Sequence, residues 1–314
     1  MKLRIGSRGS QLALWQSRHI ATLLGQAGHE VSIEIVKTTG DRLQEITFAQ
    51  VGSKGMFTKE IEDALAASRV DLAVHSLKDL PTELPAGFAL AATPPRVDPR
   101  DVFVSVRYER LADLPEGARI GTSSQRRRAQ LKALRPDLEA VEFRGNVDTR
   151  LRKLVEGQVE AILLAAAGLD RLEKTEWVRE RLEPEQFCPA AGQGALGIET
   201  RAGDEAIIRA LAFLDDAATR FAVTAERAAL EALGGGCQVP IGVHCRPCAA
   251  PEGQSGAWVE IFGVVASPES GKAVRVRYCC LREGQDATAL GQLAARSLMK
   301  DGAGSLLEAA GGIL

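Results

Sequence analysis

The chain has 314 residues, a length typical of two or three domains, with 45% hydrophobic and 25% charged residues. This composition is ordinary for a soluble globular protein and excludes a disordered tail protein, a collagen and a disulfide miniprotein. The 39 basic and 41 acidic residues give a formal net charge of −2, which argues against a dedicated nucleic-acid or membrane-surface binder.

The charge is unevenly distributed along the chain. The stretch 119–153 holds ten basic and four acidic residues, so it carries a surplus of six positive charges. The rest of the chain is correspondingly acidic. We therefore expect an anionic group to be bound by residues of this stretch.

The N-terminal segment and the cysteine content indicate the compartment. Arg4 and Arg8 interrupt the region where a signal peptide has its apolar core. The longest apolar run, Ala161–Leu169, is too short to span a bilayer and suits a buried strand that runs into a turn. Six cysteines are too few for a disulfide scaffold, so we expect a cytoplasmic protein with reduced thiols.

Strand-like and helix-like segments alternate through the first two thirds of the chain. Val31–Lys37 alternates with the period of a strand, and Asp71–His75 is short and apolar. This rhythm predicts a mostly parallel sheet with helices on both faces. Further expected strands are 119–122, 140–143 and 160–165, and the expected helices are 11–26, 59–68, 125–134 and 147–156.

Breaks in this rhythm suggest the domain organisation. The proline-rich stretch 93–99 is expected to cross between two α/β lobes. After glycines 234–236 the pattern changes to that of a smaller α+β domain. The expected elements around it are a helix over 217–233, strands over 258–266 and 273–281, and a helix over 287–300.

Three strand-to-helix junctions combine a polar cap residue with arginine. At such a helix start, free backbone amides and the helix dipole favour anions, and arginine offers forked donors to carboxylate or phosphate. One basic helix start is usually a solvated face, but open α/β sheets bind ligands at this edge and the pattern occurs three times. The residues are Ser123, Ser124, Arg126 and Arg127 in GTSSQRRR, Arg144, Asn146 and Arg150 in FRGNVDTR, and Arg8 and Ser10 in GSRGS.

Two further segments are candidates for chemistry. In VHSLKDLP, Lys78 and Asp79 follow an apolar strand. Asp79 is either a surface ion pair or helix cap, or a carboxylate that stabilises positive charge developing on a substrate. In GGGCQVP, three glycines allow close backbone approach and leave the Cys237 thiol accessible, without the histidine spacing of a nucleophile signature.

Three other segments fail the context that their motifs require. Gly192–Gly197 spells G-x-G-x-x-G but leads into a strand-like segment rather than a helix. Lys54 lies among glycines without the ending of a phosphate loop. The C-x-x-C at 245–248 would need two more zinc ligands, and the adjacent Cys279–Cys280 departs from their usual spacing. We therefore expect no metal.

Taken together, the motifs resemble the porphobilinogen deaminase (hydroxymethylbilane synthase) family. The matching segments follow the family's order from residue 4 to about residue 242, and the rest is matched loosely. GGGCQVP closely matches the family's cofactor-attachment signature. The segments are RIGSRGSQLALWQ, VGSKGMFTKE, VHSLKDLP, DPRD, IGTSSQRRRAQL, FRGNVDTRL, AAGLDRL, PAAGQGALGIE, VTAERA and GGGCQVPIG.

The resemblance implies an α/β fold with two lobes similar to type II periplasmic-binding proteins and a small C-terminal α+β domain. Domain 1, with the catalytic aspartate, would comprise 1–95 and 195–214. Domain 2, with the arginine-rich anion site, would comprise 100–190, and domain 3, with the cofactor-attachment cysteine, 217–314. A monomer without nucleic-acid or membrane partners is also implied.

The implied reaction joins four porphobilinogen molecules head to tail with release of ammonia. Hydrolysis then frees hydroxymethylbilane, which is passed on in tetrapyrrole (haem) synthesis. The implied cofactor is dipyrromethane on a Cys237 thioether, and Asp79 would be catalytic. Gln50 departs from the family, because some relatives carry a basic residue there. Other implied cofactor-binding residues are Lys78, Ser123, Ser124, Arg126, Arg127, Arg144 and Gly145, and implied substrate-binding residues are Arg8, Ser10, Lys54, Phe57, Arg150, Arg171 and Gln193.

Other classes of protein stay open at this point. A non-catalytic two-lobed module that binds a small polyanion would use the same fold, but it should carry an export signal and has no use for a cysteine domain. A zinc-stapled interaction protein would contain stoichiometric zinc. A nucleic-acid role for 119–153 is disfavoured, because its arginines lack stacking aromatic residues.

Overall fold

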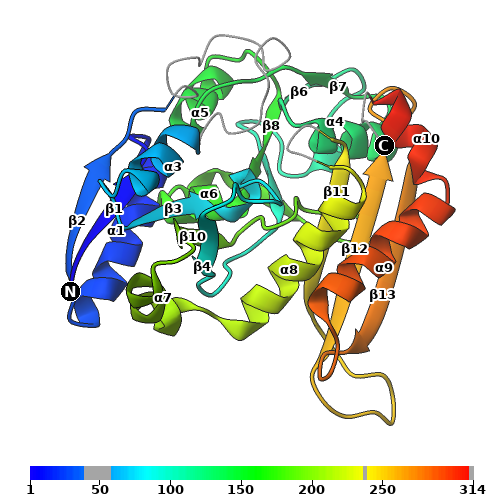
Figure 1. The fold of residues 1–314 in the computed structure, drawn as a ribbon. Helices are drawn as coiled ribbons and strands as arrows, with labels where there is room; N and C mark the ends of the chain where they lie inside the picture. The colour runs from blue at the N-terminus through cyan, green and yellow to red at the C-terminus, as the bar shows by residue number, and fades with distance from the viewer. Residues whose placement is uncertain (39–57, 236–238, 311–314) are drawn as a thin grey trace. The chain divides into compact units, whose positions relative to one another are not determined.

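The chain passes back and forth between two structural units (Figure 1). The computed structural model describes residues 1–38, 58–235 and 239–310. The predicted boundaries of three domains stay a prediction. Unit 1 comprises 1–97, 170–173 and 194–220, and unit 2 comprises 98–169, 174–193 and 221–314.

Unit 1 is built on a five-stranded sheet with the order β2-β1-β3-β10-β4. β1 pairs in parallel with β2 and β3, whereas β10 runs antiparallel to β3 and β4. The predicted mostly parallel sheet therefore has one reversed strand, because the chain re-enters it at the edge where β3 ends. The strands are β1 (Lys2–Ser7), β2 (Glu30–Ile35), β3 (Leu72–Ser76), β4 (Phe88–Ala92) and β10 (Leu196–Arg201).

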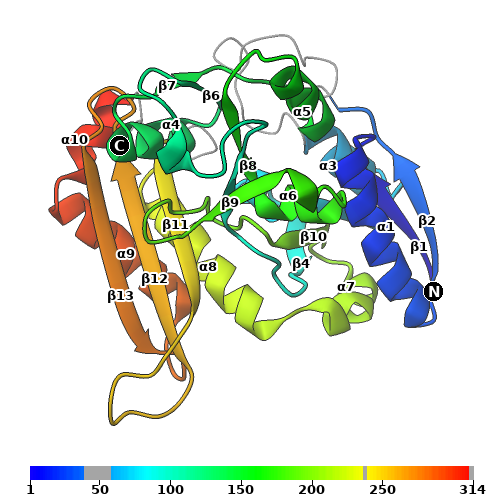
Figure 2. The same ribbon diagram turned by 180° about the vertical axis from the view of Figure 1, so that it is seen from behind.

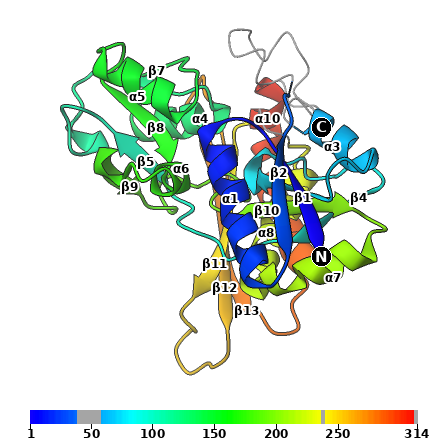
Figure 3. The ribbon, with the colours of Figure 1, turned by 90° about the vertical axis from the view of Figure 1, so that its left-hand side faces the viewer.

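Helices cover both faces of this sheet. The predicted helix 11–26 is α1 (Gln11–Gln26), whose N-cap Ser10 accepts a hydrogen bond from the Ala13 amide at 3.4 Å. It lies along β1 and β2 (Figure 3) and buries Ile20 and Leu24 against the sheet. The remaining elements are α3 (Lys59–Ala66), α7 (Glu205–Leu211) and the 3₁₀ turns η1 (Leu77–Asp79) and η4 (Ala212–Leu214).

Unit 2 contains a second five-stranded sheet that repeats the first arrangement. Its order is β7-β6-β8-β5-β9, with β6 parallel to β7 and β8, and β5 antiparallel to β8 and β9. β5 thus takes the place that β10 has in unit 1. The strands are β5 (Asp101–Val104), β6 (Arg119–Gly121), β7 (Glu139–Val141), β8 (Ala161–Ala165) and β9 (Val178–Leu182).

The helices of this second sheet begin where the sequence predicts. Ser124 caps α4 (Gln125–Leu134) and Asn146 caps α5 (Val147–Val155) through their side-chain oxygens. The run Ala161–Leu169 was expected to end in a turn, and this is wrong: β8 continues directly into α6 (Ala166–Arg171). Consecutive alanines at 165–167 explain the difference, because alanine is the strongest helix former. The 3₁₀ turns are η2 (Leu111–Asp113) and η3 (Thr175–Trp177).

The C-terminal part of unit 2 is a three-stranded antiparallel sheet with its own apolar core. Helices α8 and α9 lie on one face of it, and Figure 2 shows the sheet from the other side. β11 was not predicted, because Pro247 falls within it; an edge strand tolerates proline. The elements are α8 (Ala217–Ala232), β11 (Ile241–Cys248), β12 (Trp258–Ala266), β13 (Ala273–Leu281), α9 (Ala287–Lys300) and α10 (Ala303–Ala309).

The contact between α8 and α9 depends on a glycine. A Cβ atom on Gly291 would lie 2.1 Å from the Ala225 carbonyl oxygen and 2.9 Å from the Ala229 amide nitrogen. We expect Gly291→Ala to lower the free energy of unfolding by about 1–3 kcal/mol, because backbone atoms cannot move aside as a side chain can. Gly25→Ala on α1 is the control, since nothing lies within 4 Å of the added Cβ, and it should stabilise by about 0.5–1 kcal/mol. Urea unfolding measures the free energy of unfolding of both variants. Equal changes in this free energy would contradict the close packing of Gly291 against α8.

Candidate active site

The predicted site residues of unit 1 lie at one edge of its sheet. β1 and β3 are parallel neighbours, so Arg8 and Ser10, which follow β1, meet Lys78 and Asp79, which follow β3, at the same edge. The η1 turn that carries Asp79 is fixed by a hydrogen bond from the Leu77 amide to the Ala195 carbonyl oxygen (3.0 Å). The hydroxyl oxygen of Ser10 accepts the hydrogen bond that caps α1.

The structure narrows the alternatives for Asp79. Its side chain is exposed, and η1 has no side-chain capping hydrogen bond. Among residues 1–38, 58–235 and 239–310, no ion pair involves this carboxylate. Neither the helix-cap nor the surface ion-pair interpretation is therefore supported, and the carboxylate is available to a ligand.

Arg171 is held at this same edge of unit 1. Its Nη2 donates to the Gly194 carbonyl oxygen at 2.8 Å, and its guanidinium lies 6.0 Å from the centre of the Trp15 ring. Burial lowers the pKa of Arg171 to about 10, a value at which the side chain is still cationic at neutral pH. The edge of unit 1 that carries the exposed Asp79 carboxylate therefore also carries a buried cation.

In unit 2, the buried carboxylate of Asp101 joins two of the predicted arginines. Its Oδ2 accepts from Arg126 Nη1 at 2.6 Å, and its Oδ1 accepts from Arg127 Nη2 at 2.7 Å. Burial alone would raise the pKa of Asp101, but the two guanidiniums outweigh it and hold that pKa well below its usual range. Sequence reasoning gave Asp101 no role; it occurs only within the matching DPRD segment.

Arg126 and Arg127 also bind the surrounding backbone. Arg126 donates to the Cys188 carbonyl oxygen (2.7 Å) and Arg127 to that of Leu163 (2.9 Å). Gln193 completes the network by donating to Asp101 at 3.0 Å. Because one carboxylate faces two guanidiniums, a positive charge remains in the protein interior. The predicted contacts of these residues with a cofactor or substrate stay a prediction.

Arg150 is the least compensated cation of this cluster. Its Nε atom is buried without a hydrogen-bond partner in the part of the chain that the structure describes. Burial and the charges of Arg127 and Arg144 together lower the pKa of Arg150 to about 10, although the charge of Glu142 opposes this shift. A buried donor without a partner costs free energy, and a nearby anion would remove that cost.

The two helix starts beside Arg150 are joined to each other. Ser123 Oγ donates to the Phe143 carbonyl oxygen at 2.9 Å and accepts from the Phe143 amide at 3.3 Å. Gly145 has a φ of +123°, and a Cβ there would lie 2.6 Å from Thr149, so a side chain is excluded. The structure thus brings Ser123, Arg127, Arg144, Gly145 and Arg150 together around two helix N-termini, where several carboxylates can be bound at once.

Several predicted positions lie outside the described residues. These are Cys237, Lys54, Phe57 and Gln50. The C-x-x-C segment is described, and strand alternation separates its two thiols: Cys245 is in the core, whereas Cys248 points to the other face of the sheet. Within the described ranges, no three His, Cys, Asp or Glu side chains are grouped to hold a metal, and no helix has both the length and the apolarity to cross a membrane.

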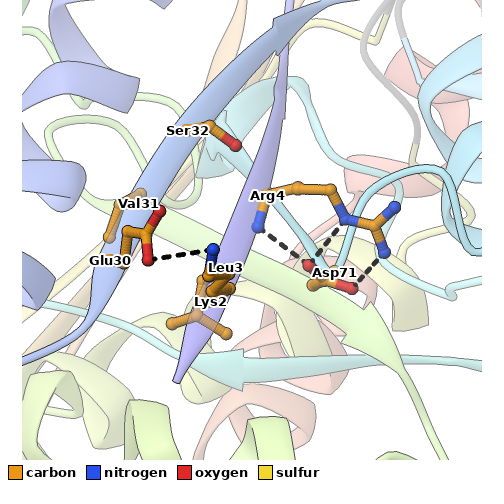
Figure 4. Close-up of a pocket in the computed structure, with 7 residues that line it drawn as sticks. All are labelled: Lys2, Leu3, Arg4, Glu30, Val31, Ser32 and Asp71. Carbon is orange, nitrogen blue, oxygen red and sulfur yellow. Dashed lines mark hydrogen bonds and ion pairs between the residues drawn. The ribbon is translucent and has the colours of Figure 1, made fainter.

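A hollow of about 460 Å³ opens at the other edge of the unit 1 sheet (Figure 4). Its charged groups are already paired: Arg4 Nη2 lies 2.8 Å from Asp71 Oδ1, and Lys2 Nζ lies 3.4 Å from Glu30 Oε2. It includes none of the predicted site residues. The lining residues are Lys2, Leu3, Arg4, Glu30, Val31, Ser32 and Asp71.

Comparisons with known proteins agree with the resemblance seen in the sequence. Two family models match: "Porphobilinogen deaminase, dipyromethane cofactor binding domain" over residues 3–209, and "Porphobilinogen deaminase, C-terminal domain" over residues 220–300. The porphobilinogen deaminase of Trichlorobacter lovleyi is 48% identical over 309 residues, covering 98% of this chain and 96% of the relative. That of Roseiflexus castenholzii is 49% identical over 310 residues, covering 97% and 98%.

Solved structures of binding proteins are more distantly similar. The methionine-binding protein MetQ is 10% identical with a TM-score of 0.44, over 68% of this chain and 89% of that one. A nutrient-binding protein of Burkholderia cenocepacia bound to methionine is 13% identical with a TM-score of 0.43, over 67% and 90%. Because both matching family models describe an enzyme, the non-catalytic binding module is not favoured.

The Asp101 network has a testable pH dependence. We expect Asp101→Asn to lower the free energy of unfolding by about 3–5 kcal/mol at pH 7, because two buried guanidiniums lose their carboxylate. The native pKa of Asp101 lies below its ordinary value of 3.8, so this stabilisation is complete above that value and is lost as the pH falls below it. In urea unfolding, the difference in the free energy of unfolding between wild type and variant should therefore decrease below about pH 4.

The control for this experiment is Asp113→Asn. Asp113 forms an exposed ion pair with Arg110 at 3.0 Å in the same unit. Loss of this ion pair should lower the free energy of unfolding by at most about 1 kcal/mol, both at pH 7 and below about pH 4. If the Asp101→Asn variant is no less stable than the control variant at pH 7, Asp101 does not compensate the buried arginines.

Proposed function

This chain belongs to the porphobilinogen deaminase family, and from that membership we propose that it joins porphobilinogen molecules head to tail, releasing ammonia at each addition, until hydrolysis frees hydroxymethylbilane. The substrate is a pyrrole with an acetate and a propionate side chain. A chain of four such units accumulates carboxylates. The protein must therefore offer positive charge to a growing anion.

Among the residues that the structure describes, the buried Nε of Arg150 has no hydrogen-bond partner, and this observation carries the proposal. It lies in a cluster with Arg127 and Arg144, at the helix starts capped by Ser124 and Asn146. Charge-assisted hydrogen bonds to a carboxylate contribute roughly 1.5–3 kcal/mol each, so a few of them hold a pyrrole unit. Such a cluster of positive charge favours the binding of carboxylates and would not favour a neutral ligand.

The same residues fit the family's dipyrromethane cofactor. Its carboxylates would be held by Arg144, Arg150 and the amides beside Ser123 and Gly145. When bound, dipyrromethane supplies the free pyrrole position to which the first substrate is added. We propose Cys237 as the attachment point, on the match of GGGCQVP to the family signature.

Asp79 is proposed to stabilise the charge that develops during each addition. Departure of ammonia leaves positive charge on the substrate pyrrole, and the exposed carboxylate accepts hydrogen bonds from pyrrole N–H groups. Arg8 and Arg171, which are held in the same unit, are suited to the substrate's carboxylates. Lys78 stands beside Asp79 on η1 as a cofactor contact.

The remaining parts of the proposal concern the protein's surroundings. We place it in the cytoplasm as a monomer that passes its product to a later step of tetrapyrrole synthesis. Nucleic-acid and membrane partners are not part of the proposal, in keeping with the nearly balanced formal charge of −2.

The role of Asp79 is tested by Asp79→Asn. We expect hydroxymethylbilane formation to fall by at least about 10²-fold, because the amide keeps the shape of the side chain and loses its charge. Folding should be unchanged, since the side chain is exposed. Asp63→Asn, an exposed carboxylate of the same unit on α3, is the matched control and should keep normal turnover. Near-normal turnover in Asp79→Asn would reject the charge-stabilising role.

The role of Arg150 is tested against its neighbour on the same helix. Arg150→Gln should lower hydroxymethylbilane formation by about one to two orders of magnitude, from the loss of one charge-assisted bond. Its free energy of unfolding without cofactor should be unchanged or higher, because the change removes a half-buried cation whose buried Nε has no partner among the described residues. Arg152→Gln, whose exposed side chain pairs with Glu156 at 2.9 Å, should leave turnover unchanged.

Intact mass is measured alongside to relate the activity of each variant to its cofactor content. If Arg150→Gln is destabilised while its activity per loaded enzyme is normal, Arg150 is a structural residue and the proposed role is wrong.

A further inference from the structure

A cluster of three ionisable side chains is buried under α3, outside the proposed site. Glu62 on α3, His75 on β3 and Glu199 on β10 are 8%, 7% and 0% exposed. Ala73 of β3 packs against the buried side of α3. His75 lies two residues further along the same strand, and Glu199 is the register partner of Ala73, so both side chains point to the face that α3 covers. Two carboxylates and one imidazole therefore share this interior.

The hydrogen bonds of the cluster leave both carboxylates incomplete. His75 Nε2 lies 2.9 Å from Glu199 Oε2. Glu62 Oε1 and Glu199 Oε1 are buried without a hydrogen-bond partner among residues 1–38, 58–235 and 239–310. An imidazolium can neutralise only one carboxylate, so ionisation of both would leave a negative charge in the interior. Such a charge is costly, whereas a protonated carboxyl group is neutral.

In the part of the chain that the structure describes, the charged groups of the surrounding elements are turned away, exposed or already paired. On α3, Glu60 and Asp63 are two residues and one residue from Glu62, a spacing at which helical side chains do not face each other. Lys59, almost one turn before Glu62, is exposed. The arginines of the neighbouring strands are paired, Arg201 with Asp204 at 2.7 Å and Arg4 with Asp71 at 2.8 Å.

The direction of the pH dependence follows from Glu62. Burial raises the pKa of Glu62 above its ordinary value of 4.5, and the charges of Glu199 and Asp63 add to this shift, although Thr58 and His75 oppose it. A carboxyl group with a raised pKa makes its full contribution to stability below the ordinary value. That contribution is lost as the pH rises through the pKa of the folded state. The contact between α3 and the sheet should therefore weaken as the pH rises.

We propose that one proton in the cluster of Glu62, His75 and Glu199 controls the packing of α3 on the unit 1 sheet: α3 is held while Glu62 is protonated and separates from the sheet when Glu62 ionises. This pH-sensitive contact does not rest on the proposed deaminase function, because none of the three residues is a proposed site residue. It lies directly behind the site, since β3 continues from His75 into the η1 turn that carries Asp79.

The test is hydrogen–deuterium exchange of the purified full-length protein, followed by mass spectrometry of a peptide that covers α3. Labelling times are adjusted for the effect of pH on the chemical exchange rate. In the wild type, the open fraction of α3 should rise by roughly tenfold between about pH 5 and about pH 9, the change that corresponds to one pKa unit. Glu62→Gln, which is neutral at every pH, should keep α3 protected. Asp63→Asn, the exposed neighbour, is the matched control and should behave as the wild type does.

A second variant tests the charge balance of the cluster. Glu199→Gln leaves one carboxylate for one imidazole, so the pH dependence of α3 exchange should be smaller than in the wild type. Protection of α3 that does not change with pH in the wild type would overturn the proposal, and so would an equal loss in Glu62→Gln. A peptide that covers α9 is the internal reference. If its protection falls together with that of α3, the protein unfolds globally and the proposal is wrong.

Discussion

The ion pairs of Asp101 with Arg126 and Arg127 determine the net charge in the interior of unit 2. One buried carboxylate neutralises one of two buried guanidiniums, so the network is stable and still positive. Arg150 adds a second cation whose Nε is buried without a partner among the described residues. In an interior of low dielectric, such charge is costly without a nearby anion, and we propose that this cost favours the binding of a polycarboxylate.

The two sheets use one arrangement for different chemistry. In each, a reversed strand begins at the edge where three parallel strands end: β10 in unit 1 and β5 in unit 2. In unit 2 that strand begins with Asp101 and organises the arginines. In unit 1 the corresponding edge carries the exposed carboxylate of Asp79 and the guanidinium of Arg171, which is hydrogen-bonded to the Gly194 carbonyl oxygen. We therefore propose that binding of the substrate's charge and stabilisation of developing charge are carried out by different units.

Local signals in the sequence predicted the helices and their capping residues well, whereas anion binding at these junctions stays a prediction. Ser10, Ser124 and Asn146 cap helices as expected, because capping depends on a few adjacent residues. The reversal of β10 and the role of Asp101 were not predictable in this way, since both depend on how the chain crosses between units. The sequence also could not show which arginines have a partner inside the protein. Counting charges treats Arg127, which pairs with Asp101, and Arg150, whose Nε has no partner among the described residues, as equivalent. Because Pro247 falls within β11, this strand was not predicted, and neither was the placement of Cys245 and Cys248 on opposite faces of the sheet.

We propose that the arginine cluster binds a pyrrole chain anchored to the protein itself, and the intact mass of the purified protein tests this most directly. We expect the wild-type mass to exceed the sequence mass by two linked pyrroles, and the excess to be absent from Cys237→Ser. A wild-type protein that makes hydroxymethylbilane at its bare sequence mass would contradict both the anchor and the assignment of Cys237.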